Sequence, residues 1–160
     1  MGVVRSRWSS TPDIAGLACR PTYGPDDLAA HHRIRHAVFV VEQELFRLDD
    51  RDAHDSHPAT IHVLGLDAGV PAGTVRLYPL DDRIWKGDRL AVLPEHRRSG
   101  LGGPLVRYAV ATAGALGGLL MVAQIQTANV RFFQALGWTA VGDPADYLGL
   151  LHQQMSIALR

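Results

Sequence analysis

The sequence predicts a single α/β domain of the α+β type, built on a mixed and mostly antiparallel sheet. Its length of 160 residues suits one domain with a core of its own. In the first half, strand-like stretches follow one another as a meander, which favours antiparallel pairing. In the second half, strands alternate with helices, which implies at least one parallel pair near the centre of the sheet.

The first half of the chain carries clear strand and helix signals. Residues 1–16 lack periodicity and are expected to form a flexible arm, so the folded domain is expected over residues 17–160. Pro25 and the two aspartates after it suit the first turn of a helix, and the valine-rich residues 38–41 favour a return to extended chain. The expected elements are a strand at 17–21, a helix at 22–39, a long polar loop at 43–58, and a hairpin of strands 60–66 and 73–80.

The second half alternates more regularly. Pro94 ends one strand, and glycines at 114–118 end the helix that follows it. The expected elements are a strand at 88–94, a helix at 101–112, a strand at 119–125, a helix at 129–137 and a strand at 151–159.

Composition narrows the class of function. Sixteen basic and sixteen acidic residues cancel, so no strong field favours nucleic acid or an anionic membrane. The single cysteine, Cys19, excludes an intramolecular disulfide and a cysteine-rich zinc site, which fits a reducing cytoplasm. No run reaches the roughly 18 apolar residues of a membrane span, and the N-terminus lacks a secretory signal. A cytoplasmic protein is therefore expected.

The stretch "LAVLPEHRRSGLGGPLV" combines a strand, a glycine-rich turn and the start of a helix. Free N–H groups at a helix N-terminus bind anions, and glycines let an oxygen-rich ligand approach the backbone. Arg97 and Arg98 add charge. A dinucleotide fingerprint would need glycine where Leu105 stands, and a P-loop sequence is absent. The turn therefore predicts a phosphate or pyrophosphate site, the alternative being a turn that only lets the helix pack closely.

This stretch resembles the acetyl-CoA motif of the GCN5-related N-acetyltransferase (GNAT) superfamily. Arg97, Gly100 and Gly102 match its Arg/Gln-x-x-Gly-x-Gly/Ala signature, and "NVRFFQALGW" is similar to a second family element. The segment "VFVVEQ", the acidic loop after it, His62, and the late "HQQM" resemble the ElaA-like branch. The resemblance implies a sheet whose central parallel strands splay apart to form a cleft.

The resemblance also implies acetyl-CoA as co-substrate and assigns residues to it. The strand Leu90–Ala91–Val92 would pair with the pantetheine arm, and the N–H of Val92 would stabilise the oxyanion. Asn129 and Phe133 would lie against the cofactor. The turn residues implied to hold the pyrophosphate are Arg97, Arg98, Ser99, Gly100, Leu101, Gly102 and Gly103.

Phe133 departs from the family pattern, because many relatives carry a tyrosine there that protonates the leaving thiolate. Tyr108 and Tyr147 are the alternative donors. A thiolate with a pKa near ~8.5 can also leave without help. Because Phe133 cannot donate a proton, a non-catalytic module that only binds acyl-CoA remains an alternative function.

An amine nucleophile needs a base, and three residues are candidates in the order His62, Glu42, His152. Each has a structural alternative as a turn cap or a satisfied polar residue. Arg76 is expected either to hold a carboxylate of the acceptor or to face solvent.

The acidic loop allows three interpretations: a solvated loop, an acidic rim that attracts a cationic amine, or a metal site around His54 and His57. No metal is expected, because a third strong ligand and a helical framework are missing.

The function expected from these observations is acyl-CoA-dependent N-acylation, with acetyl transferred to a primary amine of a small molecule by direct attack. Cys19 does not suit a covalent acyl-enzyme. The runner-up is an acyltransferase of the acyl-homoserine-lactone-synthase type. A homodimer is possible through the edge of residues 151–159.

Overall fold

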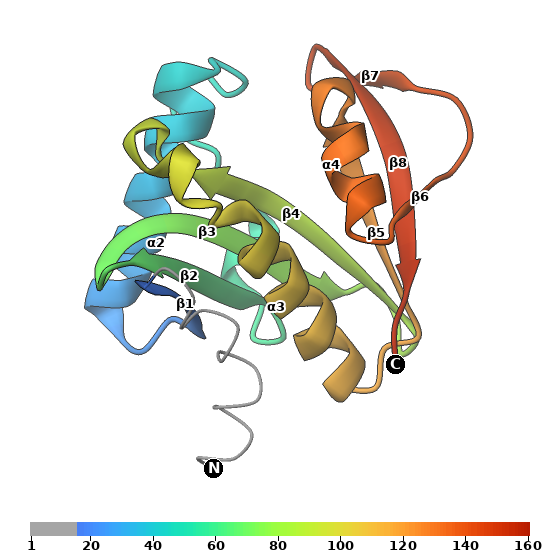
Figure 1. Cartoon of the computed structure of the whole chain (residues 1–160), viewed down its shortest axis with the longest axis horizontal. Helices are drawn as coiled ribbons and strands as arrows, with labels where there is room; N and C mark the ends of the chain where they lie inside the picture. Colours follow the sequence, from blue (N-terminus) through green and yellow to red (C-terminus); the bar gives the residue numbers. More distant parts are fainter. Residues whose placement is uncertain (1–15) are drawn as a thin grey trace.

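The computed structural model describes residues 16–160 as one mixed sheet with helices on both faces (Figure 1). Of the arm expected at 1–16, all but Gly16 lies outside the described residues. The strands are β1 (Leu17–Pro21), β2 (Ile61–Asp67), β3 (Val70–Pro79), β4 (Ile84–Val92), β5 (Leu120–Gln126), β6 (Thr139–Ala140), β7 (Ala145–Tyr147) and β8 (Leu150–Ala158). Their order is β1-β2-β3-β4-β5-β8-β6, with β7 also paired to β8. Only β4 and β5 pair in parallel among these, which confirms the predicted sheet.

Three α-helices flank the sheet in the described part of the chain. The helices are α2 (Pro25–Arg35), α3 (Gly102–Ala115) and α4 (Val130–Ala135). Apolar residues of α3 pack with β1, β3 and β5 in the main core, whereas Ala30 and Ile34 of α2 pack with Leu64 and Leu66 in a second cluster. Alternate residues of β2 point to opposite faces, so the two helices cover opposite sides of the sheet (Figure 1). None of the helices described is long and apolar enough to cross a membrane.

The expected return to extended chain at residues 38–41 is wrong. Helical structure continues beyond α2 as a π-helix over His36–Glu42. Val38 and Phe39 are buried in the second core cluster, beside Ile34. Helical winding brings these side chains onto one face, and this packing outweighs the strand propensity of valine and phenylalanine. Single π-turns of this kind are often found next to functional sites.

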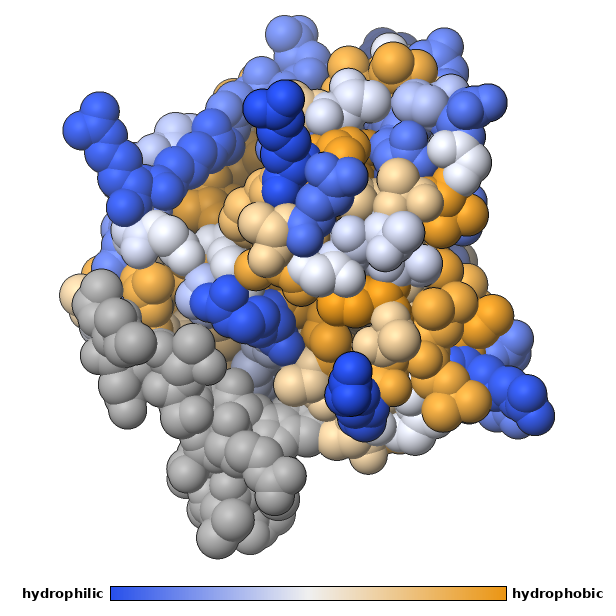
Figure 2. Space-filling model, turned by 45° about the vertical axis from the view of Figure 1, so that its right-hand side comes forward, coloured by the Kyte–Doolittle hydropathy of each residue, from blue (hydrophilic) through white to orange (hydrophobic). Residues whose placement is uncertain are grey.

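The C-terminal part of the sheet has more strands than the sequence predicted. The short strands β6 and β7 both pair with β8, at Ser156 and Met155 and at Leu150–His152. They pair with five of the nine residues of β8, on the edge that the sequence offers for a homodimer. Exposed apolar side chains gather in this region, including Val141, Leu148 and Leu151. On the face shown in Figure 2, apolar patches alternate with charged side chains.

The strands β4 and β5 stay paired over a short distance only. Ile84–Lys86 pairs with Leu120–Val122, and the later residues of the two strands have no cross-strand partner in this pair. From this point the strands diverge, and they open a V toward the top of Figure 1. A bulge in the β3–β4 register lies at Arg89, whose φ of 52° is in the left-handed region. Bulges bend a strand, so this one helps to turn β4 away from β5.

Gly73 on β3 allows α3 to approach the sheet closely. A Cβ at this position would lie 2.8 Å from Leu105 Cδ1 and 2.9 Å from the carbonyl oxygen of Ala91. Leu101 and Leu105 are fully buried there, so the space is already filled by the first turns of the helix. The close approach positions the glycine turn before α3 against the end of β4.

We expect Gly73→Ala to lower the free energy of unfolding by about 1–3 kcal/mol, because the added methyl group overpacks the core. Gly87→Ala is the matched control: its Cβ would meet the flexible end of Met121 at 3.4 Å and the carbonyl oxygen of Arg76 at an ordinary 3.9 Å. Urea unfolding of both variants measures the difference. Equal stability of the two variants would contradict this account of α3 packing.

Candidate active site

The divergence of β4 and β5 creates a cleft that opens between them. Its walls come from both strands, from the π-helix and the loop after it, from α3 and α4, and from the β7–β8 hairpin. Apolar side chains dominate the interior: Phe39, Phe46, Val106, Met121, Ile125, Phe133 and Trp138. Polar groups are few, with Lys86, Asp88 and His152 among them. A dry cleft with a small number of polar groups suits a small-molecule reaction site.

A second pocket lies at the glycine turn. Gly100 has a φ of 82° and nothing within 4 Å of the position where its Cβ would be, so the space beside it is open. The helix α3 begins at Gly102 without a side-chain cap, and Pro104 in its first turn carries no N–H. The N–H groups of Gly102 and Gly103 therefore have no partner within the helix. Such donors, with the helix dipole behind them, form a site for an anion.

The two pockets are continuous. Four residues line both of them: Leu90, Gln126, Asn129 and Phe133. Leu90 lies on β4 and Gln126 at the end of β5, so the junction spans the mouth of the V. A long ligand can therefore hold an anionic group at the start of α3 and extend its other end between the strands.

Backbone N–H groups of β4 face this junction. The N–H of Leu93 donates to the carbonyl oxygen of Ala72 on β3, at 2.9 Å. Because peptide groups alternate along a strand, the N–H of Val92 points away from β3, and that of Leu90 follows the same direction. Leu90 lines both pockets, whereas Val92 lines only the one at the glycine turn. The two N–H groups therefore offer consecutive contacts along an extended ligand.

Arg97 is held by the protein itself. Its Nη1 and Nη2 atoms each donate to a carboxylate oxygen of Glu42, at 2.6 Å, and its Nε donates to the carbonyl oxygen of Val92, at 3.0 Å. The hydrogen bonds from Arg97 hold the pKa of Glu42 below its usual value. Glu42 does not line the cleft, so the structure places it as an anchor of the glycine turn and away from the expected position of a base.

His152 is the one member of the three base candidates that lines the cleft. Its Nδ1 lies 2.7 Å from the carbonyl oxygen of Leu150 and must donate to it, because a carbonyl only accepts. In the neutral ring the lone pair is then on Nε2. The ring of Tyr147 contacts His152 edge to face, with 5.1 Å between ring centroids. Both residues belong to the β7–β8 region, which closes one side of the cleft.

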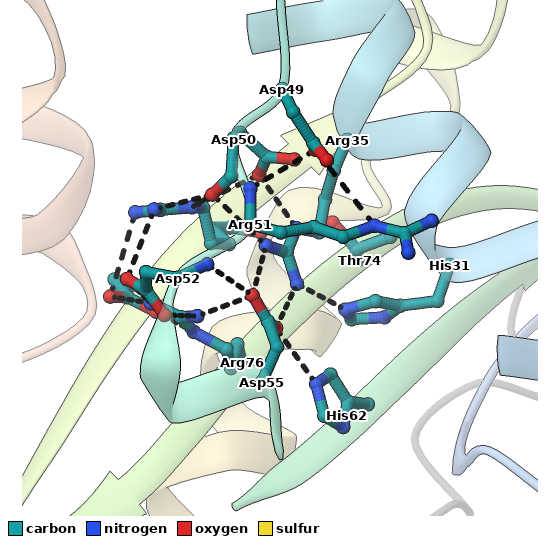
Figure 3. A network of polar contacts seen from close by, with 12 residues as sticks. His31, Arg35, Asp49, Asp50, Arg51, Asp52, Asp55, His62, Thr74 and Arg76 are labelled. Atoms are coloured by element: carbon teal, nitrogen blue, oxygen red, sulfur yellow. Dashed lines mark hydrogen bonds and ion pairs between the residues drawn. The ribbon is translucent and has the colours of Figure 1, made fainter. Parts of the chain in front are cut away.

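The acidic loop is tied to the sheet by buried ion pairs (Figure 3). The network contains three arginines and four aspartates, namely Arg35, Arg76, Arg89, Asp50, Asp52, Asp55 and Asp88. Nitrogen–oxygen distances are 2.7 Å for Arg35–Asp50, 2.7 Å for Arg35–Asp55 and 2.6 Å for Arg76–Asp52. The loop also forms a short 3₁₀ turn over Ala53–Ser56, capped by the Asp52 side chain. Most residues of the loop are exposed to solvent, but Asp50 and Asp55 point inward and anchor it.

Arg76 lies inside this network. Its side chain is fully buried, and it makes a two-pronged contact with Asp88 as well as with Asp52. Its donors are taken by the protein's own carboxylates, so it does not point a free guanidinium at an acceptor as expected. The sequence carries no signal for these contacts, because Arg76 is many residues away from both aspartates.

His62 also lies away from the cleft. Its Nε2 is 3.0 Å from Asp55 Oδ1, and its ring packs edge to face against His31, with centroids 4.9 Å apart. Burial raises the pKa of Asp55, but hydrogen bonds from His62 and Arg35 outweigh it and hold that pKa far below the usual range. His62 thus supports the ion-pair network that holds the acidic loop, on the α2 face of the sheet.

Ligand atoms of His32, Asp55 and His62 lie within 4.8 Å of one another, in an arrangement that could hold a metal ion. His54 and His57, the pair suggested by sequence, are not in this group: His54 stacks on Tyr78, and His57 accepts from the N–H of Ala59. The Asp55 carboxylate is already shared by guanidinium groups of Arg35 and Arg76, which competes with a metal ion.

Burial decides which of the remaining candidates, one cysteine and two tyrosines, can take part in the chemistry. Burial raises the pKa of Cys19 to about 12, which leaves its thiol protonated and inert. Of the two tyrosines, Tyr147 lines the cleft, whereas Tyr108 lies in the main core and burial raises its pKa to about 12.

Comparisons with known proteins agree with this geometry. Residues 26–138 match the model of the acetyltransferase (GNAT) family. The uncharacterized N-acetyltransferase YjcF of Bacillus subtilis is 30% identical over 127 residues, which cover 76% of this chain and 86% of that protein. The crystal structure of Escherichia coli ElaA superposes with a TM-score of 0.77 at 22% identity, over 88% of this chain and 98% of ElaA. BjaI, a CoA-dependent acyl-homoserine lactone synthase with SAM and isopentyl-CoA, has a TM-score of 0.68 at 24% identity, over 84% of this chain and 77% of its own. At these identities, both structures show a shared fold.

The buried His31 makes stability depend on pH. Burial and the neighbouring Arg35 lower the pKa of His31 to about 2, so it is neutral in the fold and charged in the unfolded chain below its usual pKa of 6.5. The unfolded state then binds more protons, and stability falls as the pH drops below about 6.5, by about 1.4 kcal/mol per pH unit.

We expect His31→Gln, which keeps a donor for the carbonyl of Val63, to flatten this dependence between pH 6 and 4. Urea unfolding at several pH values measures it, with the exposed His36→Gln as the matched control. A slope unchanged in the His31 variant would show that other groups carry the effect.

Proposed function

The chain belongs to the GNAT acetyltransferase family, and from that premise we propose that it transfers acetyl from acetyl-CoA to a primary amine of a small molecule. GNAT enzymes use acyl-CoA, and this chain is an acyl-CoA-dependent N-acyltransferase. The proposal of acetyl-CoA and a small amine rests on one observation. The pocket with the free N–H donors at the start of α3 is continuous with the cleft between β4 and β5.

Coenzyme A fits this continuous path. Its pyrophosphate would accept from the N–H groups of Gly102 and Gly103, and its amide-rich pantetheine arm would pair with the exposed peptide edge of β4. Leu90, Asn129 and Phe133 lie at the junction, where the thioester would sit. The N–H of Leu90, or of Val92 as expected from sequence, would polarise the thioester carbonyl.

The reaction is a direct attack within a ternary complex. The neutral amine nitrogen bonds to the thioester carbonyl carbon, the carbonyl oxygen takes the negative charge, and a base receives one amine proton. The C–S bond then breaks to give the amide and the thiolate of coenzyme A. The burial of Cys19 supports this route over an acyl-enzyme, because no other cysteine is present in the chain.

We assign the base role to His152. Its Nε2 carries the lone pair, because Nδ1 donates to Leu150, and the residue lines the cleft next to β5. Glu42 is paired with Arg97, and His62 contacts Asp55 in the ion-pair network of the acidic loop. Because neither lines the cleft, we rank both after His152 as candidates for the base.

Phe133 cannot protonate the leaving thiolate. Tyr147 lines the cleft and touches the ring of His152, so it is the tyrosine placed to donate a proton. The thiolate can also leave unprotonated, because its pKa of ~8.5 makes it a good leaving group. A protein that binds acetyl-CoA tightly without releasing thiol in the presence of amines would be a binding module instead.

The apolar depth of the cleft favours one alternative, a transferase of the acyl-homoserine-lactone-synthase type. Val106 and Met121 line the cleft behind the strands and offer contacts for a longer acyl chain. Thiol release from acetyl-CoA and from hexanoyl-CoA, each with and without S-adenosylmethionine, separates the two functions. Dependence on S-adenosylmethionine together with the longer donor would support the alternative.

Gly102→Glu is expected to weaken acetyl-CoA binding at least about 100-fold, because its carboxylate repels the pyrophosphate and fills the space it approaches. The new side chain would meet the Phe132 ring at an ordinary 3.4 Å, so the fold should be retained. Titration calorimetry measures the affinity, with the exposed Gln134→Glu as a control of equal charge. Absence of binding to the native chain would overturn the cofactor site and the proposed function.

His152→Gln is expected to lower kcat/KM by about 100-fold or more, with acetyl-CoA affinity unchanged. Thiol release with saturating acetyl-CoA and the best acceptor of an amine panel measures this. His62→Gln is the decisive comparison. A matching loss in that variant, with His152→Gln active, would restore the order predicted from the sequence.

A further inference from the structure

Lys86 is the only lysine in the chain, and its side chain lines the reaction cleft. The other fifteen basic residues are arginines. Lys86 is half-buried, and desolvating an ammonium group at the wall of a largely apolar cleft is costly without a partner. Its place there raises the question of which group it contacts.

Among the described residues, the contact recorded for the Lys86 ammonium group is with an aromatic ring. Its Nζ lies 5.8 Å from the centroid of the Tyr147 ring, within the range of a cation–π contact. Within residues 16–160, no carboxylate forms an ion pair with this nitrogen. The neighbouring Asp88 is two residues further along β4, but both of its oxygens are held by Arg76.

The second cation of the cleft is neutralised, in contrast. Arg89 donates to the Asp50 carboxylate at 3.0 Å and lies near Asp52 and Asp88. Asp50, Asp52 and Asp55 of the acidic loop are likewise shared among buried arginines. Lys86 is therefore the cation that lines the cleft without an anionic partner among the described residues.

Lys86 also lies at the end of the cleft away from the cofactor turn. It is the last residue of β4 that pairs with β5, through Val122. It lines the cleft but not the pocket at the glycine turn. Leu90 at the junction is four positions further along β4, at most about 13 Å away along the strand. An anion of coenzyme A bound at the start of α3 would not reach Lys86.

The ring of Tyr147 connects Lys86 with the assigned base. It contacts the ammonium group of Lys86 and, edge to face, the imidazole of His152. A small acceptor with its amine at His152 can therefore place another group beside Lys86.

We propose that Lys86 selects an acceptor that carries an anionic group, a carboxylate or a phosphate, in addition to its primary amine. This inference rests on the proposed function and names its substrate class. The charge-assisted contact supplies the partner that the ammonium lacks. The same positive charge disfavours the protonated form of an acceptor amine nearby, which increases the fraction of neutral nucleophile.

The proposal differs from one of the three interpretations of the acidic loop, the rim that attracts a cationic amine. That interpretation required free carboxylates at the rim, and Asp50, Asp52 and Asp55 are held by Arg35, Arg76 and Arg89. A diamine would instead bring a second ammonium toward Lys86.

The test uses matched acceptors that differ in the anion alone, with acetyl-CoA and thiol release as the readout. The pairs are butylamine with 4-aminobutanoate, phenethylamine with phenylalanine, and ethanolamine with phosphoethanolamine; the last separates phosphate from carboxylate. We expect kcat/KM to be at least about tenfold higher for the anionic member of one or more pairs. Lys86→Met should abolish this preference, Lys86→Arg should keep it, and Lys86→Glu should reverse it.

Arg83→Met is the control, because it removes an equal charge from an exposed position just before β4 that does not line the cleft. It should keep the preference. Equal turnover of both members of every pair would overturn the proposal while the N-acetyltransferase function stands. So would a preference that survives in Lys86→Met, or an equal loss for both members in that variant.

A binding experiment keeps the proposal testable without turnover. Because the chain has one lysine, protein labelled with ¹³C-lysine gives a single εCH₂ resonance. We expect 4-aminobutanoate or phosphoethanolamine to shift this resonance in a saturable way in the presence of coenzyme A, and butylamine and ethanolamine to leave it unchanged. No shift with any anionic probe overturns the anion site. Failure of acetyl-CoA to bind or react, with the shift present, overturns the proposed function alone.

Discussion

Buried ion pairs between three arginines and the acidic loop are the constraint on which the rest of the site depends. Arg35 comes from α2, and Arg76 and Arg89 come from adjacent strands, so the loop is held to both the helix and the sheet. Removing one partner of such a buried network typically costs about 3–5 kcal/mol, because a charge is left unpaired. The left-handed conformation of Arg89 belongs to the same arrangement: the bulge turns its side chain to the loop and bends β4 at the point where the cleft begins.

The splay of β4 and β5 converts this rigid framework into a site. Where the ladder ends, peptide groups of β4 lose their partners, and a ligand with amide groups can replace the missing strand. The close packing of α3, permitted by Gly73, brings the free N–H groups of Gly102 and Gly103 to the same edge. The splayed strand β4 thus supplies the backbone contacts along the cofactor, and the start of α3 supplies the anion site at its end.

The sequence predicted the parts of the site that depend on local chain geometry. A strand, a glycine turn and a helix start are contiguous in sequence, so the cofactor pocket around Gly100 and Gly102 could be expected in place. The base candidates come from distant segments, and His62 and His152 are equally plausible until the sheet shows which of them faces the cleft. The π-helix at Val38 and Phe39 was missed because burial against the sheet outweighed strand propensity. The pairing of Arg76 with Asp52 and Asp88 was missed for a similar reason: charges many residues apart carry no signal of their mutual distance.

The distribution of charge then divides the cleft by chemistry. At one end, helix donors and a glycine turn suit a pyrophosphate, and in the middle an apolar wall with Phe133 and His152 suits a thioester and a neutral amine. Since Asp50, Asp52 and Asp55 are paired with buried arginines, Lys86 is the charged side chain at the far end of the cleft that is free to contact a ligand. The acidic loop in the sequence allows a rim for cations, but among the described residues that line the cleft the ion pairs leave Lys86 as the cation without an anionic partner. The specificity of the site is in this way a consequence of the same ion pairs that hold its walls together.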